Sequence, residues 1–211
     1  LSTYAPALDA CGDTLATTKI DENVVTKSGN VEHTIRNVDR VETKRNMTFR
    51  DAIAQSKNTV AVRTLQEDVG TDLALKYLTE NFHITTMDPV NDAVAVLAIG
   101  GITNGVTNLE LTAAYASIAN QGQYIRPVFY SKVLDANDNV VLENSATAPE
   151  MSTAIKATTA YELTSAMEDV VNTRQGTASN FVNVPNMHIA GKTGTTDSYK
   201  DTWFVGYSPY Y

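Results

Sequence analysis

The sequence predicts an α+β fold, because helical and strand-like segments fall in separate blocks of the chain. Between residues 47 and 122 the apolar residues recur with helical spacing, whereas 124–144 and 187–209 alternate apolar and polar residues. Such segregation is typical of a helical cluster packed on an antiparallel sheet. The length of 211 residues suits one domain, or one domain with a small extension.

The first half of the chain is expected to be mainly helical after a long polar opening. In order, we expect a helix end at 3–11, a loop region at 13–46 with short strands around 20–25 and 33–38, two helices within 47–70, and a helix at 71–82. Thr48 and Asp51 have the spacing of a capping box, with Asp in place of the more usual Glu. The polar corner at Ser56–Asn58 divides the two helices, and Gly70 ends the second.

The second half combines helices and hairpins. In order, we expect a helix at 108–122, a hairpin at 124–144, a helix at 158–172, and two antiparallel strands at 187–195 and 201–209 joined by a turn at 196–200. Asn108 is the expected N-cap of the first helix, and Gly122 its end. The hairpin turn is expected near Asn137–Asn139. Thr159 and Glu162 have capping-box spacing at the start of the later helix.

Composition excludes several classes of function. The net charge is −8 and the basic residues are scattered, so we expect no nucleic-acid partner. One cysteine, Cys11, and the absence of a Cys/His cluster predict neither an internal disulfide nor a metal or other cofactor. The longest apolar stretch, 93–102, is too short to span a bilayer. We interpret the chain as an excised piece of a longer protein, so the missing signal segment does not locate the parent.

The segment Lys192-Thr193-Gly194-Thr195 has the chemistry of a peptide-binding strand. It offers a cation, two hydroxyls and a glycine against which a ligand backbone can lie. An edge strand of this kind can hold an extended peptide and bind its carboxylate. Strict alternation places Thr193 and Thr195 on one face and Lys192 on the other, so all three reach one cleft only on a twisted edge. The alternative is a solvated hairpin with a routine polar stretch.

Ser56 and Asn58 form a second candidate motif at the corner between two helices. A corner can present both side chains on the same side. The alternative is plain capping, because serine and asparagine are preferred N-cap residues and a helical segment follows directly.

Together, Ser-x-Asn and Lys-Thr-Gly resemble two of the three motifs of penicillin-binding proteins and serine β-lactamases. The chain most resembles the transpeptidase domain of a class A (bifunctional) penicillin-binding protein. The resemblance covers nearly the whole chain, in the segments 1–11, 47–70, 100–141, 176–179 and 189–209. It implies a penicillin-binding-protein/serine β-lactamase-like fold.

The activity implied by this resemblance is serine acyl transfer. The substrates would be peptidoglycan stem peptides ending in D-Ala-D-Ala, and β-lactam antibiotics would acylate the same serine. The resemblance also implies a parent with a glycosyltransferase domain and a membrane anchor, at the extracytoplasmic face of the bacterial cell membrane.

The resemblance carries roles to individual residues. Ser56 would belong to the proton relay, and Asn58 would hold the substrate amide. Lys192 would set the electrostatics and bind the terminal carboxylate, and the backbone N–H of Thr195 would supply half of the oxyanion hole. The predicted catalytic residues are therefore Ser56, Asn58 and Lys192, and the predicted substrate-binding residues are Thr193, Gly194 and Thr195.

The chain departs from the family pattern because no serine is followed three residues later by lysine. Ser152 and Lys156 are four residues apart, and Thr153 with Lys156 lacks the family context. We therefore expect 1–211 to be a truncated transpeptidase domain whose nucleophile precedes Leu1 and whose sheet is incomplete. This piece alone is expected to be inactive and to self-associate through the exposed edge of the strand at 203–207.

Three alternatives remain open from the sequence. The parent could be a serine β-lactamase or D,D-carboxypeptidase, which a deacylation rate would distinguish. It could also be a non-catalytic cell-wall peptide-binding or sensor domain of the same fold, in which the serine-lysine motif is lost. The last alternative is a generic α+β domain with two chance tripeptides.

Overall fold

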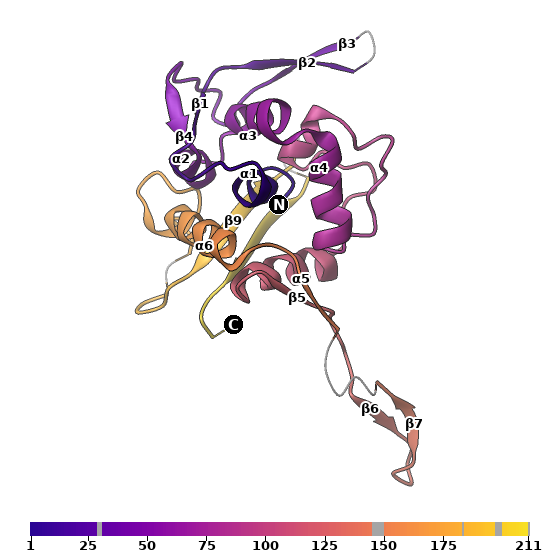
Figure 1. Ribbon diagram of the computed structural model, residues 1–211. Helices are drawn as coiled ribbons and strands as arrows, with labels where there is room; N and C mark the ends of the chain where they lie inside the picture. The colour runs from indigo at the N-terminus through magenta and orange to yellow at the C-terminus, as the bar shows by residue number, and fades with distance from the viewer. Residues whose placement is uncertain (29–30, 145–149, 183, 197–199, 211) are drawn as a thin grey trace.

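The structure confirms the α+β class, with helices packed around a small antiparallel sheet (Figure 1). The computed structural model describes residues 1–28, 31–144, 150–182, 184–196 and 200–210. Its α-helices are α1 (Tyr4–Ala10), α2 (Phe49–Ala54), α3 (Asn58–Thr64), α4 (Thr71–Lys76), α5 (Asn108–Ala119) and α6 (Ala157–Asn172). Single π-helical turns, η1 (Leu65–Val69) and η2 (Tyr77–Asn81), continue α3 and α4, and the 3-10 helix η3 (Ala95–Ile99) precedes α5.

Within the described residues the strands pair two by two, always antiparallel. The pairs are β1 (Thr18–Ile20) with β4 (Asn46–Thr48), β2 (Val24–Ser28) with β3 (Val31–Ile35), β5 (Gln123–Ile125) with β8 (Met151–Thr153), β6 (Lys132–Leu134) with β7 (Val140–Glu143), and β9 (Ala190–Thr195) with β10 (Thr202–Tyr207). The predicted final hairpin is confirmed as β9–β10, with Thr195 opposite Thr202. Residues 197–199 of its predicted turn lie outside the described residues.

The hydrophobic core lies between the helices and β9. Helix α6 packs against both α2 and β9, and α5 packs against β10. Phe49 of α2 and Val170 of α6 are fully buried in this core. Arg50 of α2 forms an ion pair with Asp169 of α6 at 2.7 Å, which secures this contact at its rim. The two helices and β9 therefore form one packed unit that carries Ser56 at the end of α2 and the Lys192–Thr195 segment in β9.

Several local predictions are confirmed. Two helices, α2 and α3, meet at the polar corner, and α2 begins with the predicted cap, in which Thr48 accepts a hydrogen bond from the Asp51 N–H. The helix end at 3–11 is α1, and the helix at 71–82 is α4 with η2. The turn near Asn137–Asn139 lies between β6 and β7, where the carboxylate of Asp135 accepts hydrogen bonds from the N–H groups of Asn137 and Asn139.

Two predicted helix caps are wrong. Helix α5 is capped by Thr107, which forms a capping box with Glu110, so Asn108 is its first helical residue. At the start of α6 the N-cap is Lys156, whose side chain makes no capping bond. The carboxylate of Asp9 accepts hydrogen bonds from the Lys156 N–H and the Thr159 hydroxyl instead, both at 2.8 Å. A carboxylate brought from α1 therefore replaces the predicted Thr159–Glu162 box.

Two regions contain a different strand arrangement from the one predicted. The polar stretch 13–46 holds β1, the β2–β3 hairpin and the start of β4. Strand β1 pairs with β4, which lies directly before α2. In 124–144 only β6 and β7 pair with each other, whereas β5 pairs with β8 beyond the hairpin. Pairing partners distant in sequence leave no local signal, which explains why the β1–β4 and β5–β8 pairs were not predicted.

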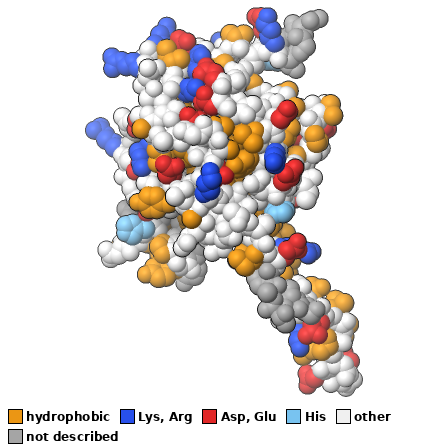
Figure 2. All heavy atoms as spheres, viewed as in Figure 1, with side chains coloured by type: hydrophobic (Ala, Val, Ile, Leu, Met, Phe, Trp, Pro, Cys, Tyr) orange, Lys and Arg blue, Asp and Glu red, His pale blue; other side chains and the backbone are white. Residues whose placement is uncertain are grey.

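The β2–β3 and β6–β7 hairpins project from the body in different directions (Figure 1). Hydrophobic side chains lie along the β6–β7 projection, where Val133, Leu134 and Val141 are exposed (Figure 2). None of the helices in the described part of the chain is long and apolar enough to cross a membrane.

Candidate active site

Ser56 occupies a strained backbone position at the end of α2. Its N–H donates to the Ile53 carbonyl, and the N–H of Lys57 donates to the Ala52 carbonyl. This pattern is a Schellman motif, whose C′ residue adopts the left-handed conformation that glycine prefers. Ser56 has φ of 55° there. A serine in this place lowers stability relative to glycine. Strain of this kind is typical of functional sites, which points to a use for the Ser56 hydroxyl.

Lys192 of β9 reaches that serine. Its Nζ donates to the Ser56 Oγ at 2.7 Å and to the Thr193 carbonyl at 2.9 Å. Ser56 and Lys192 are separated by 136 residues in the sequence. Removal from water lowers the pKa of Lys192 from 10.5 to about 8. The structure therefore brings two of the predicted catalytic residues into contact and lowers the pKa of the lysine by burial.

The other predicted site residues lie around this contact. The Thr193 hydroxyl lies 2.6 Å from the Thr177 hydroxyl. Gly194 and Thr195 are exposed toward the end of β9. Asn58 begins α3, and its amide donates to the Arg36 carbonyl at 3.0 Å, which ties the corner to the loop before β4.

The first residue of the chain lies at the same place. Burial, and then the charge of Lys192, lower the pKa of the Leu1 amino group to about 6. Its neighbour Ser2 donates to the Leu97 carbonyl at 2.9 Å. Figure 1 shows the N-terminus near the centre of the molecule, beside α1.

A buried polar network lies next to the Ser56–Asn58 corner. Asp21 is fully buried and accepts hydrogen bonds from the Asn37 amide at 2.6 Å, the Thr59 hydroxyl at 2.7 Å and the Thr43 N–H at 3.0 Å. Lys57 is also buried, with its Nζ 2.8 Å from the carboxylate of Asp39 and 4.0 Å from that of Asp21. Burial acts to raise the pKa of Asp21, but these hydrogen bonds outweigh it and lower the pKa.

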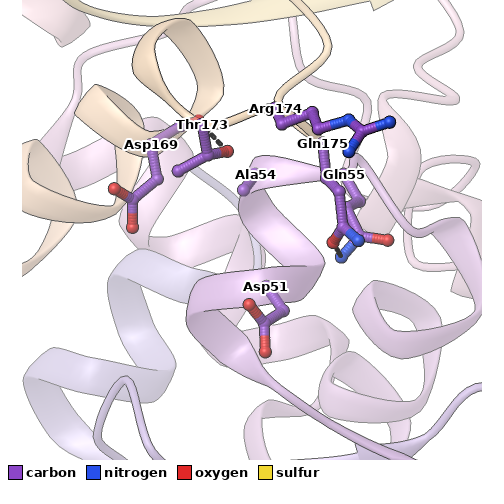
Figure 3. Close-up of a pocket in the computed structure, with 7 residues that line it drawn as sticks. All are labelled: Asp51, Ala54, Gln55, Asp169, Thr173, Arg174 and Gln175. Atoms are coloured by element: carbon purple, nitrogen blue, oxygen red, sulfur yellow. Dashed lines mark hydrogen bonds between the residues drawn. The ribbon is translucent and has the colours of Figure 1, made fainter.

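A shallow pocket of about 270 Å³ lies between the C-terminal ends of α2 and α6, next to Ser56 in sequence (Figure 3). It is lined by Asp51, Ala54, Gln55, Asp169, Thr173, Arg174 and Gln175. Both acidic and basic side chains line it, so it does not favour one charge of ligand. Among the described residues there is no cluster of three or more His, Cys, Asp or Glu side chains placed to hold a metal ion.

The chain belongs to the penicillin-binding protein transpeptidase family. The family model described as the penicillin binding protein transpeptidase domain matches residues 2–211. The resemblance inferred from the two motifs and the segments between them is thereby confirmed, and so is the transpeptidase-like fold.

Named relatives agree with this membership. The chain is 38% identical over 165 residues to penicillin-binding protein 1A of Aquifex aeolicus, covering 78% of this chain and 21% of the relative. It is 29% identical over 221 residues to penicillin-binding protein 1A of Clostridium tetani, covering 100% of this chain and 27% of the relative. The chain thus spans about a quarter of the length of these proteins or less.

A solved structure supports the fold. The D,D-transpeptidase domain of a peptidoglycan glycosyltransferase from Eggerthella lenta matches with a TM-score of 0.75 at 24% identity, covering 99% of this chain and 55% of that one. The likeness extends over almost the whole chain, so the helical cluster and the β9–β10 sheet have the arrangement found in that domain.

Sequence reasoning gave no role to Thr177 or Asp21. Each carries one of the closest polar contacts around the two motifs. The only signal for Thr177 was its place in the segment 176–179, which resembles the family. Asp21 was one polar residue among many in the stretch predicted as a loop.

Proposed function

We propose that the full-length protein is a peptidoglycan D,D-transpeptidase that works by serine acyl transfer. The observation that carries this proposal is the 2.7 Å contact between Lys192 Nζ and Ser56 Oγ. It joins the Ser-x-Asn and Lys-Thr-Gly motifs of a chain that belongs to the transpeptidase family. A lysine of lowered pKa hydrogen-bonded to a hydroxyl is suited to moving a proton and to stabilising negative charge.

The roles proposed for the residues follow from this contact. Lys192 presents its ammonium to the terminal carboxylate of the stem peptide and polarises the Ser56 hydroxyl, which belongs to the proton relay. Thr193 and Thr195 donate hydrogen bonds to the same carboxylate, and Gly194 lets the peptide backbone approach β9. The Asn58 side chain holds the substrate amide. These roles account for the polar composition of a strand that is otherwise part of the core unit.

We further propose that the acylated serine precedes Leu1 in the full-length protein. The observation that supports this is that no serine in the 211 residues has a lysine three residues later. The 211-residue polypeptide alone is therefore expected to be catalytically inactive, since loss of the nucleophile removes the covalent step.

Labelling by a fluorescent penicillin, followed by intact mass, tests this function. We expect the label on the full-length protein and none on the 211-residue polypeptide. Label on the shorter polypeptide would move the nucleophile to a residue within it, with Ser56 the first to test. A folded full-length protein that takes no label would contradict the proposal in favour of a non-catalytic binder, and rapid loss of the label would favour a β-lactamase.

The pH dependence of acylation tests the charge of Lys192. If the ammonium attracts the substrate carboxylate, acylation should fall as the pH rises through about 8, because the lysine then loses its proton. A Lys192→Arg variant stays protonated over this range, so its slower acylation should not fall at the same pH. Acylation that instead increases through pH 8 would assign the neutral amine as the active form.

Partners and location follow the same proposal. Stem peptides ending in D-Ala-D-Ala and β-lactams would bind along β9. The full-length protein would carry a glycosyltransferase domain and a membrane anchor and would work at the extracytoplasmic face of the cell membrane. The support is the penicillin-binding protein 1A relatives, of which the matched region is only a part.

The free polypeptide is also proposed to self-associate. Among the described strands, β10 pairs only with β9, and Trp203 and Phe204 are exposed along it. An unpaired edge with exposed aromatic residues favours pairing with another copy. Sedimentation should therefore show dimers or larger species of the 211-residue polypeptide as its concentration increases, and a monomer at every concentration would contradict this.

A further inference from the structure

The turn that follows α6 touches both candidate motifs. This turn, residues 173–179, is called the α6 turn below. The N–H of Thr177 donates to the carbonyl of Ala54, two residues before Ser56, at 3.2 Å. The Thr177 hydroxyl lies 2.6 Å from the hydroxyl of Thr193. One residue thus joins the helix that presents Ser56 to the strand that presents Lys192.

A second contact ties the turn to the same helix. The amide of Gln55 donates to the Gln175 side-chain oxygen at 2.8 Å, and both side chains lie together in Figure 3. Gln55 directly precedes Ser56, so the α6 turn holds the chain on the N-terminal side of the strained serine. The turn therefore meets α2 at two successive residues.

The α6 turn itself is held rigidly on its helix. The N–H of Ala178 donates to the Val170 carbonyl at 3.0 Å. A Cβ added to Gly176 would lie 2.4 Å from the carbonyl oxygens of Asp169 and Val170, closer than any side chain can sit. The backbone of the turn thus packs directly on the end of α6, and Thr177 projects from a fixed support.

We propose that Thr177 is a positioning residue for the transpeptidase site. Its hydroxyl fixes the rotamer of Thr193, and its backbone fixes the distance from β9 to the Ser56 corner. Thr193 can then meet the substrate carboxylate beside Lys192 without first reorienting. This inference rests on the proposed function for its effect on acylation, but the positioning itself is a property of the fold.

The experiment compares variants of the full-length protein that differ in one hydroxyl. Thr177→Val keeps the shape and removes the hydroxyl, and Thr177→Ser keeps the hydroxyl. Thr173→Val is the matched control, because among the described residues the Thr173 hydroxyl in the same turn donates only to the Asp169 carbonyl of its own helix. The readouts are the binding and covalent steps of acylation by fluorescent penicillin, and hydrogen exchange in peptides covering 190–195.

We expect Thr177→Val to lower the second-order acylation rate about tenfold, mainly in the binding step, since one well-placed hydrogen bond is lost. Thr177→Ser and Thr173→Val should stay within about twofold of the wild type. Adding Thr177→Val to Thr193→Val should cost little more, because both remove the same contact. Amides at 190–195 should exchange faster in Thr177→Val only.

Other outcomes would overturn the inference. Equal acylation and exchange in Thr177→Val and wild type would do so, as would equal losses in Thr177→Val and Thr177→Ser, which would make side-chain volume the cause. If the wild type takes no label, the proposed function fails, and faster exchange of 190–195 in Thr177→Val than in Thr173→Val still decides the positioning. If the valine variant does not fold, Thr177→Ala serves in the same comparison.

Discussion

Replacing Lys192 with alanine is expected to slow acylation of the full-length protein by penicillin about a thousandfold. The change removes the ammonium expected to meet the carboxylate and the group that contacts Ser56 Oγ at 2.7 Å. Groups that transfer protons or stabilise developing charge typically contribute about 10²–10⁴ in rate. Rapid mixing with a fluorescent penicillin, with the acylation rate measured against concentration, provides the test.

Ser56 variants provide the controls for this result. Ser56→Ala removes the hydroxyl and keeps the left-handed backbone, whereas Ser56→Gly removes the hydroxyl and also the strain at φ of 55°. Both should slow acylation, but only Ser56→Gly should leave the corner at least as stable as in the wild type. The acylation rate of the double variant Lys192→Ala with Ser56→Ala should be no lower than that of the slower single variant, because the two residues act as a unit. Fully additive losses would show that the two act separately.

Local sequence signals predicted the elements whose determinants lie close together. Thr48 caps α2 by accepting a hydrogen bond from the N–H of Asp51, three residues later, and the polar corner at Ser56–Asn58 lies within one turn. Where the determinant is distant, prediction failed: the cap of α6 comes from Asp9, which is 147 residues from Lys156. A pattern within 158–172 holds no information about a carboxylate on α1.

The candidate site also combines features that the sequence predicts locally with contacts between residues distant in sequence. Lys192 and Ser56 were selected because each lies in a motif that resembles a known family, and residue spacing alone gave no reason to place them in contact. Strict strand alternation places Lys192 and Thr193 on opposite faces, and the long lysine side chain lies along the strand, with its Nζ donating to the Thr193 carbonyl at 2.9 Å. For Thr177 the only sequence signal is its place in the segment 176–179, because its contacts with Ala54 and Thr193 depend on the packing of three segments.

Replacing Asp21 with alanine is expected to destabilise the transpeptidase domain by about 3–5 kcal/mol, as removal of one partner from a buried charged network usually does. The side chain is fully buried, and its loss removes an acceptor of the Thr59 hydroxyl and the Asn37 amide and leaves Lys57 with Asp39 as its ion-pair partner. Hydrogen exchange of the helix at 58–64 in the full-length protein, together with its thermal melting, measures the change.

Glu22→Ala is the matched control for this prediction. Glu22 is the next residue along the chain, and its carboxylate forms a partly exposed ion pair with Arg63 at 3.1 Å, for which a loss within about 1 kcal/mol is expected. If the two variants lose equal amounts of stability, the larger contribution predicted for Asp21 is wrong. The pKa of Asp21 is lowered by its hydrogen bonds, so its contribution should be present above pH of about 4 and be lost as the pH falls through the folded-state pKa. Lys57 lies between Ser56 and Asn58, so a loosened network should also slow acylation, which would connect the stability of this loop to the chemistry of the corner.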